Sequence, residues 1–315
     1  MKTARDRIYS ETSSAAPSIE LGDAGYPANL REISTPPERL YVRGTMTDGD
    51  ALAVAIVGSR TATSYGLAVA ERLAAELAAR GITVVSGLAR GIDSAAHRGA
   101  LRVGGRTLAV LGSGVDVIYP PENRRLAREI EGHGAVISQF APGTRPLAGH
   151  FPARNRVIAG LSLGVVVVEA AERSGSLITA GLAGELGREV MAVPGPVTSL
   201  RSVGAHRLIQ DGAALVTSGE DVICQLPQRW RDRVSSPPGP GVTIMPGAPR
   251  FVPEQHDDHT QLLLGLIGEE PTDIDGIIER SGLTPGRASA LLVALEVEGR
   301  IRQLAGKRFV HVNLG

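Results

Sequence analysis

Short apolar runs alternate with helical patterns through residues 53–226, and this alternation constrains the fold more than any other feature. The apolar runs predict strands at 53–58, 82–86, 107–111, 135–138, 165–169, 190–193 and 214–216. Between them, apolar residues at helical spacing predict helices, the clearest at 64–80, 93–103, 124–131, 177–186 and 205–210. Strands that are apolar throughout are typical of a parallel sheet covered on both faces. We therefore predict a Rossmann-like, doubly wound, mostly parallel α/β sheet that binds ligands at the carboxyl ends of its strands.

The composition changes on both sides of this region. Residues 1–52 precede the first predicted strand, and we expect them to form an N-terminal lead-in segment. Residues 227–256 contain seven of the chain's 20 prolines, which predicts an extended linker. Residues 257–315 carry the pattern of a C-terminal winged helix-turn-helix domain. Its predicted helices are 260–267, 273–281 and 286–298, followed by a β-wing at 301–312.

Charge and cysteine content exclude several classes of protein. Lys+Arg and Asp+Glu are 33 each among 315 residues, so any attraction to a polyanion must be local. The single cysteine, Cys224, excludes a disulfide framework and a cysteine-ligated metal centre. The scattered histidines lack metal-binding spacing, and the apolar runs fall short of the ~18 residues of a membrane span. We expect a cytoplasmic protein with no metal, no cofactor and no membrane contact.

Small residues and arginines follow several of the predicted strands. After the first strand, Gly58 and Ser59 offer backbone N–H groups and Arg60 a guanidinium, which together suit a phosphate. The other predicted strand-end loops contribute Arg90, Gly112, Ser113, Gly114, Phe151, Arg154, Asn155, Arg156, Ser174, Gly175, Ser176 and Thr179. Tight turns explain each glycine, but not why residues 90–160 contain ten Arg and five Asp+Glu. This local excess predicts a polyanion site, whose loop arginines should matter for binding and little for folding.

Two patterns that resemble catalytic motifs lie in the wrong context. Residues 160–164 match GxSxG, but Ser162 lies where a helix runs into a strand, the reverse of a nucleophile elbow. His97 lies in a helix of small residues, where a packed histidine is expected. The turn at 58–60 matches neither GxGxxG nor GxxxxGK[ST], which disfavours dinucleotide and P-loop sites. We predict no catalytic residue and no enzymatic activity.

Several motifs together resemble the DprA/Smf family of DNA-processing proteins. They are VAIVGSR (54–60), VSGLARGID (85–93), LAVLGSGVDVIYP (108–120), FPARNRVIAGLS (151–162), SGSLITA (174–180) and PGPVTSLRSVGAHRLIQDGA (194–213). The resemblance covers about residues 21–315. It implies a homodimer that binds and protects incoming single-stranded DNA during natural transformation and helps to load the RecA recombinase.

The resemblance also assigns roles to particular residues. It implies an anion-binding turn at Gly58–Arg60 and a basic wall of Phe151, Arg154, Asn155 and Arg156, with Ser174, Gly175, Ser176 and Thr179 opposite. Gln139 stands where the family usually has Glu. Because aromatic residues are 3% of the chain, base stacking must depend on a few rings, with Tyr119, Phe140 and Phe151 as candidates.

Two other functions remain as alternatives. A nucleoside-phosphate-processing enzyme, of the lysine-decarboxylase-like phosphoribohydrolase type, carries PGGxGT followed by a catalytic Glu. Here residues 194–198 read PGPVT, and residues 199–218 contain no Glu. A regulator that reads duplex DNA through its winged helix is disfavoured, because residues 257–315 have six Lys+Arg and nine Asp+Glu. A protein-contact or self-association role suits this unit better.

Overall fold

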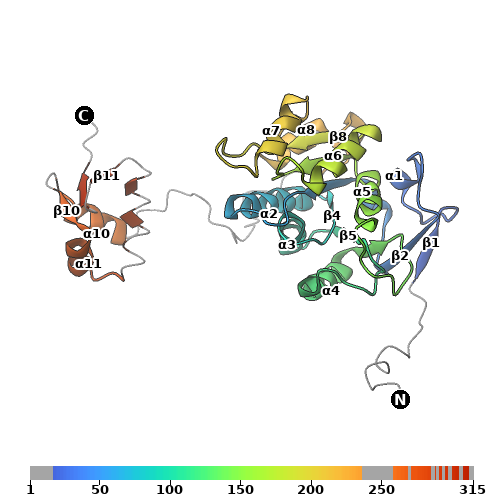
Figure 1. Cartoon of the computed structure of the whole chain (residues 1–315), viewed down its shortest axis with the longest axis horizontal. Helices are drawn as coiled ribbons and strands as arrows, with labels where there is room; N and C mark the ends of the chain where they lie inside the picture. Colours follow the sequence, from blue (N-terminus) through green and yellow to red (C-terminus); the bar gives the residue numbers. More distant parts are fainter. Residues whose placement is uncertain are drawn as a thin grey trace, which may run out of the picture. The chain divides into compact units, whose positions relative to one another are not determined.

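The computed structural model describes residues 17–235, 258–268, 271–284, 288, 291–292, 295–296, 300–304 and 308–311. The chain divides into two compact units, Met1–Ala248 and Pro249–Gly315, shown in Figure 1. No helix among these described residues is long and apolar enough to cross a membrane.

A nine-stranded sheet forms the centre of the first unit (Figure 1). Its strands are β1 (Ser18–Glu20), β2 (Arg39–Gly44), β3 (Ala53–Val57), β4 (Thr83–Ser86), β5 (Thr107–Val110), β6 (Ala135–Ser138), β7 (Gly164–Val167), β8 (Glu189–Ala192) and β9 (Ala214–Leu215). They lie in the order β1-β2-β6-β5-β4-β3-β7-β8-β9. Strands β3 to β9 pair in parallel, whereas β1 and β2 add antiparallel strands at one edge. The predicted doubly wound, mostly parallel sheet is confirmed.

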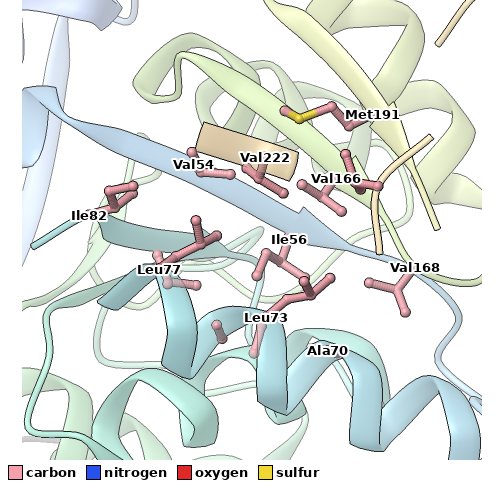
Figure 2. Close-up of a cluster of buried hydrophobic side chains, with 14 of the residues drawn as sticks. Val54, Ile56, Ala70, Leu73, Leu77, Ile82, Val166, Val168, Met191 and Val222 are labelled. Carbon is pink, nitrogen blue, oxygen red and sulfur yellow. The ribbon is translucent and has the colours of Figure 1, made fainter. Parts of the chain in front are cut away.

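Helices cover both faces of this sheet, as its wholly buried central strands β3 to β7 require. One face carries α2 (Ser64–Ala79), α3 (Ile92–Arg102), α4 (Arg124–His133) and α8 (Gly219–Gln225). The other carries α1 (Ala28–Arg31), α5 (His150–Leu161), α6 (Gly175–Glu185) and α7 (Val203–Gln210). Strand β3 contributes to both cores. Its Val54 and Ile56 pack with Leu73 of α2, as Figure 2 shows, and its Ala55 packs on the opposite face.

The sheet begins before residue 53, because the described part of the predicted lead-in segment (1–52) contributes strands β1 and β2. Strand β2 pairs with β6, and Val42 lies opposite Ile137. Leu30 of α1 and Leu40 of β2 are fully buried in the core that α5 covers. A short 3-10 helix, η1 (Asp48–Ala51), then leads directly into β3. The described residues 17–52 therefore belong to the α/β unit.

The α/β unit also has ordered elements after residue 226, where the predicted linker starts. Residues 227–235 form α9 (Gln228–Arg231) and a turn, and Trp230 and Val234 pack against the core beneath α2. The backbone N–H of Ser235 donates to the carbonyl of Arg80 at 3.1 Å. These contacts extend the α/β unit to residue 235, and the rest of the predicted linker lies outside the described residues.

The C-terminal unit has the predicted winged-helix pattern. Its described elements are α10 (Asp258–Leu266), β10 (Thr272–Asp273), α11 (Ile274–Ser281), β11 (Ile301–Leu304) and β12 (Arg308–His311). The three strands form a sheet in the order β10-β12-β11. Leu263, Ile277 and Phe309 belong to the apolar core of this unit. Of the predicted third helix, residues 288, 291–292 and 295–296 are described, and they are helical.

Candidate nucleic-acid interface

A cavity lies where the strand order of the sheet reverses. Strands β4, β5 and β6 lie on one side of β3, and β7, β8 and β9 lie on the other, so β3 marks the switch point where doubly wound sheets bind ligands. The cavity has a volume of about 650 Å³ and lies at the carboxyl ends of β3, β4 and β7. Its lining includes Gly58, Ser59, Arg60, Ala89, Asp93, Phe151, Arg154, Asn155, Arg173, Ser174, Gly175, Ser176 and Thr179.

The turn after β3 is held by its neighbours. The N–H of Ser59 donates to the carbonyl of Glu169 at 2.8 Å, and the N–H of Ile92 donates to the carbonyl of Ser59 at 3.2 Å. A side chain at Gly58 would place its Cβ 2.6 Å from Cγ1 of Ile92, so the turn requires glycine here. Arg60 projects from this fixed backbone and is exposed. It has no ion-pair partner within residues 17–235.

The segment 151–156 was predicted to be a loop but forms the first turns of α5. Pro152 is the third residue of this helix, a position whose N–H has no intrahelical acceptor, so proline is tolerated there. Residues two apart on a helix point to different sides. Arg154 consequently faces the cavity, while Nη2 of Arg156 donates to Oγ of Ser34 at 2.8 Å. The predicted basic wall therefore includes Phe151, Arg154 and Asn155 and excludes Arg156.

Arg154 is buried and acts as a brace between strand ends. It donates to the carbonyl oxygens of Gly87 and Val110, the latter at 2.7 Å, and its Nε donates to Oδ1 of Asn155 at 3.1 Å. Burial lowers the pKa of Arg154, which the carboxylate of Asp93 opposes. The expectation that arginines at this site matter little for folding is therefore wrong for Arg154.

Asp93 provides a negative charge beside these arginines. Burial raises the pKa of its carboxyl group, while Arg154, the backbone N–H of Ala89 and Arg60 act in the opposite direction. Its Oδ2 accepts hydrogen bonds from the N–H groups of Gly87 at 3.1 Å and Ala89 at 3.3 Å. Asp93 thus fixes the turn after β4 against the start of α3.

The N-terminus of α6 closes the opposite side of the cavity. Ser174 caps this helix by accepting from the N–H of Ser176 at 3.3 Å. Nδ2 of Asn155 donates to the carbonyl of Gly175 at 3.3 Å and ties α5 to this end of α6. Thr179 lies one turn further along and is buried. A helix N-terminus carries partial positive charge, so this wall favours an anion.

A smaller pocket of about 40 Å³ adjoins the cavity and shares Arg60, Phe151 and Arg154 with it. The guanidinium carbon of Arg60 lies 5.0 Å from the centre of the Phe151 ring, and that of Arg154 lies 5.8 Å from it. The Tyr119 ring is 6.3 Å from the Phe151 ring. Phe140, the third predicted stacking ring, instead stacks on His150 at 4.1 Å and lies outside both pockets.

The remaining predicted residues are divided between the small pocket and the turn behind it. Arg90, Gly112 and Ser113 line the small pocket, and Arg90 forms an ion pair with Glu122. Gly114 lines neither pocket. Its N–H donates to the carbonyl of Thr144 at 2.9 Å, so its role is to hold a turn.

Sequence reasoning missed Arg173 and Asp93. Arg173 directly precedes the SGS motif, so its position after β7 was a sufficient signal. Asp93 lies in the first turn of α3. Its position in the cavity depends on how β3 and β4 pair, which no local pattern reports.

The two apparent catalytic residues have structural partners. His97 is fully buried, and its Nδ1 lies 2.7 Å from Oγ1 of Thr107. Burial lowers the pKa of His97 to about 3, so the imidazole is neutral. Ser162 is also fully buried, and its hydroxyl donates to the carbonyl of Ile158 at 2.9 Å. Among the described residues, no group of three acidic, histidine or cysteine side chains could hold a metal.

Comparison with known proteins places this geometry in a family. The model of DNA recombination-mediator protein A matches residues 18–227, and that of the DprA winged helix domain matches residues 247–307. The chain is 41% identical over 287 residues to Protein Smf of Escherichia coli, which covers 89% of this chain and 74% of the relative. It is 48% identical over 209 residues to the DNA processing protein DprA of Streptococcus pneumoniae, covering 66% and 74% of the two chains.

Solved structures agree with this assignment. DNA processing protein A from Streptococcus pneumoniae superposes with a TM-score of 0.64 at 47% identity, covering 68% of this chain and 75% of that chain. DNA processing protein A from Helicobacter pylori, studied for its single-stranded DNA binding mode, gives a TM-score of 0.59 at 31% identity, with 65% and 93% coverage. The chain described here therefore belongs to the family of DNA recombination-mediator protein A and carries the family's winged helix domain.

Proposed function

We propose that the chain binds single-stranded DNA in the cavity at the carboxyl end of its sheet and catalyses no reaction there. The observation that carries this proposal is the combination of unpaired cations with an aromatic ring in one cavity. Arg60 and Arg173 are exposed at the cavity, and neither has an ion-pair partner in the described part of the chain. The ring of Phe151 lines both this cavity and the small pocket.

This arrangement suits a single strand better than a duplex. Proteins that bind single strands combine cations that follow the phosphates with aromatic faces on which bases stack. A cavity of about 650 Å³ has the size of a small-molecule site. It can therefore receive a splayed nucleotide, whereas the bases of a duplex are stacked inside the helix and cannot enter.

Removing both unpaired arginines tests the proposal. We expect Arg60→Ala/Arg173→Ala to weaken binding of labelled oligo(dT), measured by fluorescence anisotropy. If ~3–4 phosphates are neutralised, the affinity of the unaltered protein falls roughly 30-fold between 50 and 200 mM salt. The double variant should have a salt slope smaller by about 1.4, or about 0.7 for each lost contact.

Arg125→Ala/Arg128→Ala is the matched control, because it removes the same two charges from α4, where both arginines are exposed. Unchanged oligo(dT) binding by the double variant would overturn the site assignment.

The proposal extends to the biological role that the resemblance implies. The protein would act in the cytoplasm during natural transformation, protect incoming single strands and help to load the RecA recombinase. The family's description as a recombination mediator supports this role. Loading is tested by measuring RecA-dependent strand pairing on DNA coated with single-strand-binding protein, with and without this chain. No stimulation would contradict it.

We also propose that the chain works as a homodimer. Exposed apolar side chains occur in the loop that follows β8 and in β9, the last strand of the sheet, with Val197 88%, Leu200 81% and Leu215 51% exposed. Exposed apolar groups beside a sheet edge are typical of an interaction surface. Light scattering should give the mass of a dimer, and Leu200→Glu/Leu215→Glu should reduce it to that of a monomer. A dimer that survives this change would exclude this surface.

The alternative of a nucleoside-phosphate-processing enzyme is not favoured. The loop that follows β8 contains residues 194–198, but residues 199–218 contain no Glu that could act as the catalytic residue. Steady turnover of a nucleoside monophosphate, lost in the Arg60→Ala/Arg173→Ala variant, would revive this alternative.

A further inference from the structure

The cationic cavity contains a carboxylate that phosphate binding does not explain. Asp93 lines the cavity and is 6% exposed, and Arg154 and Arg60 are near enough to influence its ionisation. A buried negative charge repels phosphate. The phosphates of a bound strand should therefore stay at the rim, near Arg60, Arg173 and the N-terminus of α6, and leave the region beside Asp93 to another part of the nucleotide.

The two oxygens of Asp93 differ in their hydrogen bonding. Oδ2 accepts both backbone bonds, from Gly87 and Ala89. Oδ1 accepts none from the described residues, and it is not among the enclosed side-chain atoms that lack a partner. Oδ1 is therefore open to the cavity, where it can accept hydrogen bonds from a ligand. A ligand donor that reaches this oxygen forms a hydrogen bond to a charged acceptor, which is stronger than a bond between neutral groups.

We propose that Oδ1 of Asp93 accepts hydrogen bonds from the edge of an inserted nucleobase and makes the cavity prefer guanine. This inference rests on the proposed single-strand binding. Splayed bases are read on their Watson–Crick edges, as in other single-strand binders. Guanine presents two neighbouring donors there, N1–H and the N2 amino group, next to the acceptor O6. The other bases present one donor group on this edge, so guanine best matches a carboxylate oxygen beside arginines.

The substitution Asp93→Asn is almost isosteric and tests this proposal. In Asp93→Asn, the amide oxygen can take the place of Oδ2 and keep both backbone bonds, which leaves the NH₂ group at the position of Oδ1. The cavity then presents a donor in place of an acceptor, with the turn after β4 unchanged. Glu129→Gln is the matched control, since it removes one negative charge from α4, away from the cavity.

The experiment uses the full chain and labelled oligo(dT) with one central dT replaced by dG, dA or deoxyinosine. Deoxyinosine keeps N1–H and O6 of guanine but lacks the N2 amino group. We expect the protein to bind the dG oligonucleotide about tenfold more tightly than the deoxyinosine one, the discrimination that a good base contact provides. Asp93→Asn should reduce this ratio to about twofold or less, and Glu129→Gln should keep it.

The outcomes separate this inference from the proposed function. Equal affinities for dG, dA and deoxyinosine in the unaltered protein would overturn the role of Asp93, while tight oligo(dT) binding would leave the proposed function standing. A dG preference that persists in Asp93→Asn would also overturn it. Failure to bind any of the oligonucleotides would overturn both. The dG-to-deoxyinosine comparison in the unaltered protein does not depend on the variant's folding.

Discussion

The α/β unit buries five acidic or basic side chains, whereas every buried residue described in the C-terminal unit is apolar. The five are Asp50, Asp93, His97, Arg154 and Glu169. Most of them have close polar partners, for example the ion pair of Asp50 with Arg106 at 2.8 Å. Burying such groups is unfavourable unless they are paired, so their concentration in one unit requires a reason beyond stability. Two of them, Asp93 and Arg154, line the cavity, which points to function in the α/β unit.

The largest effect is expected from breaking the brace at Arg154. Arg154→Ala leaves the carbonyls of Gly87 and Val110 without this donor, and Asp93 without its buried counter-charge. The free energy of unfolding of the α/β unit should fall by about 3–5 kcal/mol. Urea denaturation followed by circular dichroism measures this loss. Arg60→Ala, which removes an exposed arginine from the same cavity, should change it by no more than about 0.5 kcal/mol. Equal stability of the two variants would contradict the bracing role.

The C-terminal boundary of the α/β unit affects the stability of that unit. A chain that stops at residue 226 loses Trp230 and Val234, which pack against the core, whereas one that stops at residue 235 keeps both. Loss of a partly buried tryptophan and its neighbour should reduce the free energy of unfolding by about 2–4 kcal/mol. Thermal denaturation of the two fragments compares them directly. Equal melting temperatures would return residues 227–235 to the linker.

The buried histidine gives the α/β unit a pH dependence of its own. Burial lowers the pKa of His97 from 6.5 to about 3, so between these values the unfolded chain binds a proton that the folded chain does not. The stability from this group is fully present above pH 6.5 and is lost as the pH falls, at up to about 1.4 kcal/mol per pH unit.

Substitution of His97 tests this pH dependence. His97→Asn can still donate to Thr107 but does not titrate, so its free energy of unfolding should depend less on pH between 6.5 and 4. Urea titrations at several pH values compare the two slopes. If the free energy of unfolding changed equally with pH in the variant and in the unaltered protein, His97 would not be the group responsible.

The parts of the fold that sequence patterns predicted are those that local residues determine. Strands β3, β4 and β7 are short apolar runs, and the turn at Gly58 follows from a glycine that ends such a run. Strand β2 was missed because RLYVRG alternates polar and apolar residues, as suits an antiparallel strand with one solvated face, rather than forming an apolar run. Trp230 was assigned to the linker because nearby prolines dominate the local composition.

Sequence patterns predicted which residues form the site, but not how those residues are arranged. Small residues and arginines at strand ends located the cavity, and most of the predicted residues line it or the adjoining pocket. Sequence could not show that 151–156 is helical, because Pro152 suits a loop as well as a first helical turn. That difference decides that Arg154 faces the cavity and Arg156 faces Ser34. The position of Asp93 depends on the packing of α3 against β3 and β4.

The most direct test of the account is to separate the two units and titrate both against one oligo(dT). The cavity lies within residues 57–179, and residues 257–315 carry a net charge of −3, which disfavours a phosphate backbone. We expect a fragment ending at residue 235 to bind within about threefold of the full chain, and residues 249–315 alone to show no binding at physiological salt. A fragment that stays folded by circular dichroism yet loses more than tenfold, about 1.4 kcal/mol, would contradict the account, since it would assign DNA binding to the winged helix as well.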